Sequence, residues 1–381
     1  MRDIPVRHVR YDVNERPFLV IWEVTKACQL VCQHCRADAV DQRHPRELST
    51  ADGMAMLDEL ADLGAPPPLV VLTGGDPFER DDLFELLAHG AQRGLSMAQS
   101  PSVTARLTPE SIAQAKAAGA RAVSLSLDGA VAATHDMFRG IAGVFDATIT
   151  AARDVRQAGL RLQINTTVTR SNARELPAIL QLVEHAQAWL WSVFFLVPTG
   201  RGANIDAPDP DETEAILHWL HDVSGRIAIK TTEAPHYRRI AVERTRRRSS
   251  AIARPPISRL HHLYAELRAL TDTSEVAARP AARPPLDINA GRGFVFIDHL
   301  GIVYPSGFLP VAAGSVRSQP LLDIYRNAPL MRMLRDPKRL HGACGSCGFA
   351  DVCGGSRSRA FALTGDVFAD DPACVLAAER V

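Results

Sequence analysis

The sequence Trp22–Arg36, WEVTKACQLVCQHCR, decides the fold, and it begins inside the apolar run Phe18–Val24. Its three cysteines, Cys28, Cys32 and Cys35, have C-x3-C-x2-C spacing. Three thiols cannot all be paired in disulfides, and a closed structural zinc site normally takes four ligands. Thiolates select zinc or iron–sulfur clusters, and a cubane held by three cysteines keeps one iron open for a substrate or cofactor. A chance cluster, or a zinc loop completed by a distant histidine, is the alternative.

The composition is that of a globular protein of 381 residues, long enough for two domains or one large domain with an appendage. Its net charge of zero gives no reason to expect nucleic acid or an anionic membrane as a partner. No apolar run approaches the roughly 18 residues of a membrane span, and the N-terminal residues lack the apolar core of a signal peptide. We therefore expect a cytoplasmic protein. Seven cysteines in two tight groups favour metal sites over a disulfide scaffold.

Apolar strand-like runs alternate with helical patterns along the first half of the chain. This alternation predicts an α/β fold with a parallel sheet and helices packed outside it. Six units are expected, which suit a partial (β/α)6 barrel with its ligand site at the carboxyl ends of the strands. The expected strands are Phe18–Val24, Leu69–Leu72, Leu95–Gln99, Ala122–Leu127, Leu160–Val168 and, as the last of the series, Trp191–Val197. The expected helices are Thr50–Leu63, Glu79–Arg93, Pro109–Ala118, Asp146–Gln157, Glu175–Ala188 and Pro208–Gly225.

The second half of the chain changes character. Residues 226–290 are rich in arginine and proline and are predicted to be a bridging segment, with a helix at His261–Leu270. We interpret the run Arg244–Arg248 as solvated surface. Residues 294–297 and 302–304 predict a β-hairpin, and Leu321–Arg335 predicts a helix. The expected domains are thus an N-terminal extension (1–17), the barrel (18–225), the bridging segment (226–290) and a small hairpin-plus-helix, cluster-binding domain (291–381).

Two short motifs follow predicted strands. Gly74-Gly75-Asp76-Pro77 comes after Leu69–Leu72; its glycines allow a close backbone approach, and proline restricts the turn. Alone, this motif is equally typical of a tight turn. Ser126-Leu127-Asp128-Gly129 ends the strand Ala122–Leu127 and is followed by His135-Asp136-Met137-Phe138-Arg139. Without further context, Arg139 would be interpreted as a surface residue.

Together, these motifs resemble those of the radical S-adenosylmethionine (SAM) superfamily. The resemblance implies a 4Fe–4S cluster on Cys28, Cys32 and Cys35 whose open iron is chelated by SAM. His34 stands where the family usually has an aromatic residue near the adenine. Gly74, Gly75, Asp76 and Pro77 are similar to the family's GGEP motif, which meets the SAM amino group, with Asp76 in place of Glu. Ser126, Asp128 and Arg139 match the pattern SLDG…HD-x-[FY]-R, whose serine and arginine hold the SAM carboxylate.

The remaining cysteines have the spacing Cys344-x2-Cys347-x5-Cys353-x20-Cys374. Four soft ligands can close one site, either a structural zinc or a 4Fe–4S cluster, and the spacing leaves both open. The group resembles a reduced form of the SPASM domain, in which auxiliary clusters follow a radical SAM barrel. That resemblance implies one auxiliary 4Fe–4S cluster with four protein ligands. Ser306 stands where such domains often have a further cysteine.

Within the superfamily, the chain is most similar to the haem-biosynthesis branch. The stretches that carry this similarity are WEVTKACQLVCQHCRA (22–37), TTEAPHYRR (231–239), VYPSGFLP (303–310) and CGGSRSRAFALTGD (353–366). They imply reductive SAM cleavage, hydrogen abstraction and oxidative decarboxylation, or another modification, of a tetrapyrrole side chain. His236, Arg238 and Arg239 are candidates for pairing substrate carboxylates, unless they form ordinary surface salt bridges. A flavodoxin- or ferredoxin-type protein is the expected electron donor.

Two other functions remain open at this point. The first is a maturase that modifies a ribosomally synthesised peptide. Only the short segment Met1–Pro17 precedes the first predicted strand, which leaves little room for a domain that binds a precursor peptide. The second is a zinc-binding interaction protein without catalysis, which would leave the glycine and arginine motifs unexplained. No general acid or base is identified from the sequence.

Overall fold

The computed structural model describes residues 5–249, 260–272 and 283–378. One large mixed sheet curls through the molecule in the strand order β11-β10-β9-β1-β2-β3-β4-β5-β6-β7, with β8 beside β9. The run from β1 to β7 is entirely parallel. These strands are β1 Leu19–Glu23, β2 Leu69–Thr73, β3 Ser96–Gln99, β4 Ala122–Ser126, β5 Arg161–Val168, β6 Leu190–Phe195 and β7 Ile229–Thr232.

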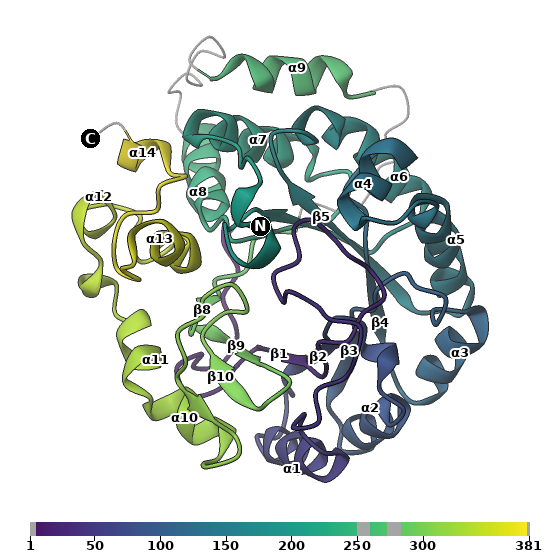
Figure 1. The fold of residues 1–381 in the computed structure, drawn as a ribbon. Helices are drawn as coiled ribbons and strands as arrows, with labels where there is room; N and C mark the ends of the chain where they lie inside the picture. Colours follow the sequence, from purple (N-terminus) through teal and green to yellow (C-terminus); the bar gives the residue numbers. More distant parts are fainter. Residues whose placement is uncertain (1–4, 250–259, 273–282, 379–381) are drawn as a thin grey trace.

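Helices cover the outside of this curved sheet (Figure 1). The first seven are α1 Thr50–Ala61, α2 Leu83–Gln92, α3 Pro109–Ala117, α4 Ala132–Arg139, α5 Val144–Gln157, α6 Leu176–His185 and α7 Pro210–Val223. Capping boxes begin α1, α3 and α7 at Ser49, Thr108 and Asp209, where they satisfy backbone N–H groups that lack a helical partner. The sheet and helices enclose Trp22, Trp191 and Trp219, all fully buried. The predicted partial barrel is confirmed.

The structure corrects several predicted element boundaries. Trp191–Val197 is not the last strand, because β7 pairs with β6; its four residues include one apolar side chain, too few for a recognisable pattern. Helix α4 was not predicted. The helix expected at Glu79–Arg93 begins only at Leu83, after a 3-10 turn at Pro77–Glu79. Further 3-10 turns lie at 173–175, 200–204 and 337–339.

The C-terminal part is joined to the barrel through the sheet. Strand β9 (Gly293–Ile297) pairs in parallel with β1 and forms the predicted hairpin with β10 (Ile302–Tyr304). The other elements are β8 Asn289–Ala290, β11 Gly314–Ser315, α12 Gly342–Gly345, α13 Arg357–Thr364 and α14 Val375–Ala378. The helix predicted at Leu321–Arg335 is two helices, α10 Leu321–Asn327 and α11 Pro329–Leu334. Ala328 adopts an extended conformation between them, because a residue before proline is disfavoured in the helical region.

The arginine-rich run lies in helix α8 (His236–Ser249) and is followed by α9 (His262–Leu270). Its interpretation as solvated surface is wrong for Arg244, whose largely buried guanidinium pairs with Asp222. Arg246 lies over the ring of Phe349 at 5.8 Å. The helix therefore packs between the barrel and the cysteine-rich C-terminal part (Figure 1). Within residues 5–249, 260–272 and 283–378, no helix combines the length and the apolar character that crossing a bilayer requires.

Candidate functional site

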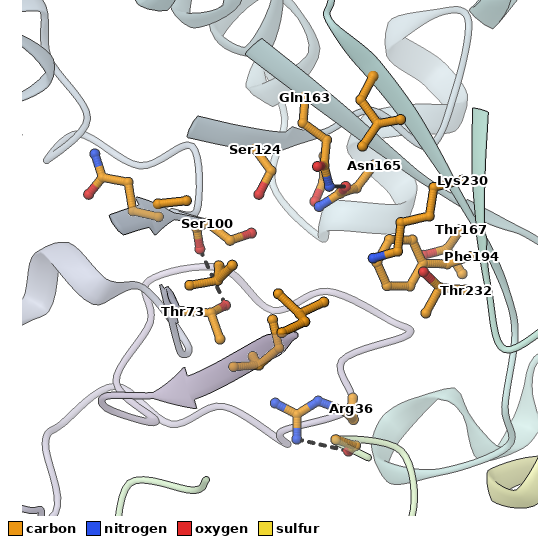
Figure 2. A pocket seen from close by; sticks show the side chains of 18 of the residues that line it. Arg36, Thr73, Ser100, Ser124, Gln163, Asn165, Thr167, Phe194, Lys230 and Thr232 are labelled. Carbon is orange, nitrogen blue, oxygen red and sulfur yellow. Dashed lines mark hydrogen bonds between the residues drawn. The ribbon is translucent and has the colours of Figure 1, made fainter. Parts of the chain in front are cut away.

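A cavity of about 940 Å³ occupies the inside of the barrel. Alternate residues of each strand point inward and form its walls. The two halves of the wall differ in chemistry. Strands β1, β2 and β9 contribute an apolar half, formed by Leu19, Ile21, Leu69, Val71, Phe294 and Phe296. Strands β4, β5 and β7 contribute a polar half, formed by Ser124, Ser126, Gln163, Asn165, Thr167, Lys230 and Thr232 (Figure 2). The cavity is thus amphipathic and suits a large ligand with apolar and polar parts.

The three N-terminal cysteines lie together in one wall of this cavity, after the carboxyl end of β1. Cys28 and Cys32 pack with Leu30 and Val144, and Cys35 packs against this group. The Cys28 Sγ lies 3.3 Å from the Ser102 Oγ, and the amide of Leu30 donates to it over 3.4 Å. Burial raises the pKa of Cys28, and these two hydrogen bonds partly oppose that rise. Such contacts favour the thiolate that a metal requires.

Within the described residues, no three His, Cys, Asp or Glu side chains converge closely enough to hold a single metal ion. This finding concerns one ion rather than a cluster, since each cysteine of a cubane binds a different iron atom. Other features fit a cluster with a polar ligand beside it. The His34 Nδ1, the Arg139 Nε and two nitrogens of Arg201 are buried without a hydrogen-bond partner in the described part of the chain. The donor set and these unpaired atoms fit a 4Fe–4S cluster and SAM.

Gly74 and Gly75 bring the β2 loop against the cysteine loop. A Cβ on Gly74 would lie 2.5 Å from the Thr25 carbonyl oxygen, and one on Gly75 would lie 2.2 Å from that of Ala27. Both obstacles are backbone atoms, which cannot move aside cheaply. The amides of Gly75 and Asp76 donate to the carbonyl groups of Thr25 and Ala27 over 2.9 and 2.7 Å. These glycines therefore set the position of the cysteine loop.

Asp76 lies behind this contact, fully buried, and neither it nor Pro77 lines the cavity. Its carboxylate accepts hydrogen bonds from the Thr104 hydroxyl at 2.8 Å and the Phe78 amide at 3.2 Å. Burial raises the pKa of Asp76 to about 6, despite these hydrogen bonds. The carboxylate thus lies behind the residues that line the cavity. Its contact with SAM remains a prediction.

We expect Asp76→Asn to stabilise the protein at neutral pH. The pKa of Asp76 rises from 3.8 to about 6 on folding, so the stability that this group adds is fully present below pH 3.8 and is lost as the pH rises through 6. At neutral pH the buried charge costs the folded state about 3 kcal/mol, which an uncharged amide avoids. Urea unfolding at pH 4 and pH 7.5 should show a gain for the variant at pH 7.5 only. An equal effect at both pH values would disprove the assigned pKa.

Arg139, Asp128 and His34 form a buried network at the carboxyl end of β4. The Arg139 guanidinium pairs with the Asp128 carboxylate and reaches to 3.7 Å from the Cys32 Sγ. Burial raises the pKa of Asp128, but the charge of Arg139 holds it below its usual value. The Thr167 amide also donates to this carboxylate over 2.6 Å. Arg139, far from being a surface residue, places a positive charge between a carboxylate and the cysteine loop.

His34 and Ser126 face the cavity beside this network. The His34 Nε2 lies 3.8 Å from the Asp128 Oδ2, and its ring packs against Phe138 with centroids 5.2 Å apart. Burial lowers the pKa of His34 to about 4, although the charge of Asp128 opposes this. His34 is therefore neutral at physiological pH and offers a flat, uncharged surface. The structure brings both predicted residues to the same end of the barrel as the cysteines.

Two cavity arginines were not identified from the sequence. Arg36 donates to the Glu23 Oε2 at 2.5 Å and to the Gly307 carbonyl at 3.1 Å, so it ties the cysteine loop to β1 and the hairpin (Figure 2). Arg201 reaches this loop from beyond β6, and its amide donates to the Cys35 carbonyl over 3.1 Å. The preceding Gly200 has a φ of +55°. The signal that could have identified Arg201 is the glycine-flanked sequence Thr199-Gly200-Arg201-Gly202, which follows an expected strand.

The four C-terminal cysteines lie in a separate region around α12, α13 and α14. Burial raises the pKa of Cys353 to about 11 and that of Cys374 to about 12, and the charge of Cys353 adds to the second shift. These two thiols are therefore neighbours. The Arg357 Nη2 lies 4.0 Å from the Cys344 Sγ, and nearby Arg239 opposes the rise at both Cys353 and Cys374. Burial thus favours the neutral thiols in the absence of a metal, and the nearby guanidinium groups only partly offset that effect.

Of the three residues predicted to pair substrate carboxylates, Arg238 lines the cavity and His236 and Arg239 do not, and none of them is a surface residue. All three are buried. The His236 Nε2 lies 3.0 Å from the Asp371 Oδ2, and Arg239 pairs with Glu214 and Glu243. Among the described residues, Arg238 donates to main-chain carbonyl groups, those of Leu286, Ile288, Val352 and Cys353. His236 and Arg238 thus hold the cysteine-rich part against the barrel, and Arg239 joins α8 to α7.

Ser306 has a similar structural role. Its hydroxyl donates to the Glu233 carboxylate over 2.9 Å, as do the hydroxyls of Ser356 and Ser358 over 2.5 and 3.0 Å. Glu233 follows β7 and adopts a φ of +57°. The residue at the position of an absent cysteine thus helps to dock the hairpin and α13 on the barrel.

Comparisons with known proteins agree with this geometry. Residues 22–183 match the model of the Radical SAM superfamily. The AdoMet-dependent heme synthase of Methanosarcina barkeri is 37% identical over 365 residues, which cover 95% of this chain and 97% of that protein. Mycofactocin maturase MftC of Mycobacterium ulcerans is 30% identical, over 95% of this chain and 88% of the maturase. Streptococcus suis SuiB bound to S-adenosylmethionine has a TM-score of 0.64 at 15% identity, covers 95% of this chain and 78% of its own, and shares the fold.

Proposed function

Because this chain belongs to the radical SAM superfamily, we propose that it modifies a tetrapyrrole, by oxidative decarboxylation or a related change of a carboxylate side chain. A 4Fe–4S cluster and SAM are its cofactors, as in the family. When bound, they supply a radical that removes a hydrogen atom from an unactivated carbon. The protein's own part is to hold the substrate and exclude water.

The observation that carries the tetrapyrrole proposal is the chemistry of the cavity. Its apolar half offers two phenylalanine rings and four aliphatic side chains to a flat macrocycle. Ten of its described lining residues are lysine or arginine, and Glu233 is the one carboxylate among them. Arg36 and Arg139 are paired with Glu23 and Asp128 behind the wall, and the excess of basic groups that remains favours an anionic ligand. A ring system with several carboxylates fits both properties, and the haem synthase relative supports the same class.

The residues around the cysteine loop have separate tasks in this proposal. Cys28, Cys32 and Cys35 hold the cluster, and Gly74 and Gly75 fix the loop that carries them. Ser126 and Arg139 would donate to the SAM carboxylate, Asp128 would hold Arg139 in place from behind, and neutral His34 would lie against the adenine. In a propionate, loss of a hydrogen atom next to the macrocycle and of the carboxylate as CO2 leaves a vinyl group and releases one electron to an acceptor.

An auxiliary cluster on Cys344, Cys347, Cys353 and Cys374 would be such an acceptor. Its support is the set of four soft ligands and the adjacent guanidinium groups of Arg357 and Arg239. A SPASM-like domain over residues 291–381 is part of the same proposal. The proposal also includes a cytoplasmic location, where thiols stay reduced. It includes a flavodoxin- or ferredoxin-type electron donor, because these clusters need a low-potential reductant.

The experiment that tests this function uses protein reconstituted anaerobically with iron and sulfide. It is incubated with SAM, dithionite and an iron porphyrin that carries propionate groups, and the porphyrin is analysed by mass spectrometry. We expect a product that has lost one CO2 and two hydrogen atoms for each side chain changed. An unchanged porphyrin, together with active SAM cleavage, would contradict the tetrapyrrole proposal.

Peptide modification is the second candidate, and the mycofactocin maturase relative supports it. The same assay with a ribosomal precursor peptide in place of the porphyrin separates the two. Peptide turnover with an unchanged porphyrin would replace the first proposal by the second.

A further inference from the structure

Lys230 is a basic side chain of the cavity with no role in the site described so far. We propose that its ammonium group binds a carboxylate of the substrate inside the barrel and thereby fixes the orientation of the macrocycle. This inference rests on the proposed function, because it assumes a ligand with carboxylate groups. It adds a specificity-determining residue that no sequence motif indicated.

The sheet places Lys230 at the level of the SAM-binding residues. In the register of neighbouring strands, Lys230 on β7 is opposite Ser192 on β6, which is opposite Asn165 on β5, which is opposite Ser126 on β4. A group bound by Lys230 would therefore lie along the polar wall at the level of Ser126. Figure 2 shows its side chain extending into the cavity beside Phe194, Thr167 and Thr232.

The ammonium group has no partner among the described residues. No hydrogen bond or ion pair connects Lys230 to them. Its polar neighbours are otherwise engaged or uncharged, since Gln163 and Asn165 hydrogen-bond to each other at 2.7 Å. Glu233, the lining carboxylate, is occupied by three serine hydroxyls. A partly buried cation that faces a cavity without a counter-charge favours the binding of an anion.

Three other basic side chains of the cavity differ from Lys230 in this respect. Arg36 is paired with Glu23, and Arg139 is paired with Asp128. Arg238 is saturated by main-chain carbonyl groups. Burial alone lowers the pKa of Lys230 to about 8, which leaves the amine mostly protonated at neutral pH. A substrate carboxylate would therefore meet a charged and unpaired donor at this point.

The test is an anaerobic titration that measures binding rather than turnover. The probes are haem, which has two free propionates, and its dimethyl ester, which has the same macrocycle without the charges. They are added to the reconstituted wild-type protein and to the variants Lys230→Met, Lys230→Arg and Lys116→Met. Lys116 is a matched control, because it lines the same cavity but its Nζ donates to the Gly159 carbonyl at 3.0 Å.

We expect Lys230→Met to weaken haem binding by roughly 10- to 100-fold, the value of a charge-assisted hydrogen bond, and to leave ester binding unchanged. Lys230→Arg and Lys116→Met should keep the wild-type preference for haem over the ester. Equal haem affinity of wild type and Lys230→Met, with porphyrin binding intact, would overturn the role of Lys230 and leave the proposed function standing. Failure of the wild-type protein to bind either probe would contradict both the role of Lys230 and the proposed function. Equal iron content and melting temperature of the variants verify that they are folded.

Discussion

Replacing Cys32 with alanine should reduce SAM cleavage to an undetectable level and lower the iron content by up to about four atoms per chain. Cys32 lies between the other two ligands in sequence, and its sulfur faces the guanidinium of Arg139 at 3.7 Å. Two thiolates hold a cubane poorly, and a cluster that is lost cannot deliver the electron that SAM cleavage needs. The measurement is 5′-deoxyadenosine formed from SAM and dithionite, together with iron and sulfide analysis.

The matched control is Cys374→Ala, in the other group of cysteines. It should lower the iron content similarly but keep some formation of 5′-deoxyadenosine, because the electron reaches SAM through the first cluster. Porphyrin conversion should fall, since the acceptor for the released electron is missing. Undiminished SAM cleavage in Cys32→Ala, or none in Cys374→Ala, would contradict the assignment of the two groups.

The second large effect is expected from Arg139→Met, which should lower the free energy of unfolding by about 3–5 kcal/mol at pH 7, because it leaves the carboxylate of Asp128 buried without its partner. Arg139 holds the pKa of Asp128 below its usual value, against the effect of burial. Without Arg139, burial should raise that pKa above its unfolded value. The stability contribution of Asp128 would then be present at low pH and lost as the pH rises.

Urea unfolding of the cluster-free protein checks this prediction. The loss in Arg139→Met should be smaller at pH 4 than at pH 7, and the double variant Arg139→Met with Asp128→Asn should recover much of it. Arg161→Met, a change at an exposed arginine, should alter stability by no more than about 0.5 kcal/mol. A loss at pH 7 no larger than that of Arg161→Met would show that the ion pair is not buried in solution.

The cysteine loop and the barrel could be predicted because their signals are local. The spacing of Cys28, Cys32 and Cys35, and the apolar runs of β1 to β6, depend on residues close together in the sequence. Strand β7 was missed because its inward positions are Lys230 and Thr232. A strand that lines a polar cavity lacks the apolar alternation by which strands are recognised. The polar side chains that made this strand hard to recognise are the ones that line the cavity and suggest its function.

The roles of charged residues were harder to predict, because they depend on partners distant in sequence. Arg238 and Arg239 lie in a stretch similar to haem-biosynthesis enzymes, and their sequence context indicated substrate binding. Their partners, among them Glu214 and the Cys353 carbonyl, became evident only when α7, α8 and the C-terminal loops were placed together. Arg139 shows the same limit, because its sequence context alone indicated a surface residue. The structure shows it buried and paired with Asp128.

The most direct test of the account is the fate of the substrate hydrogen. An iron porphyrin that carries deuterium on the propionate carbon next to the macrocycle is incubated with the reconstituted protein, SAM and dithionite. The proposed function predicts deuterium in the 5′-deoxyadenosine and a matching amount of decarboxylated porphyrin. Unlabelled 5′-deoxyadenosine beside an intact porphyrin would contradict it.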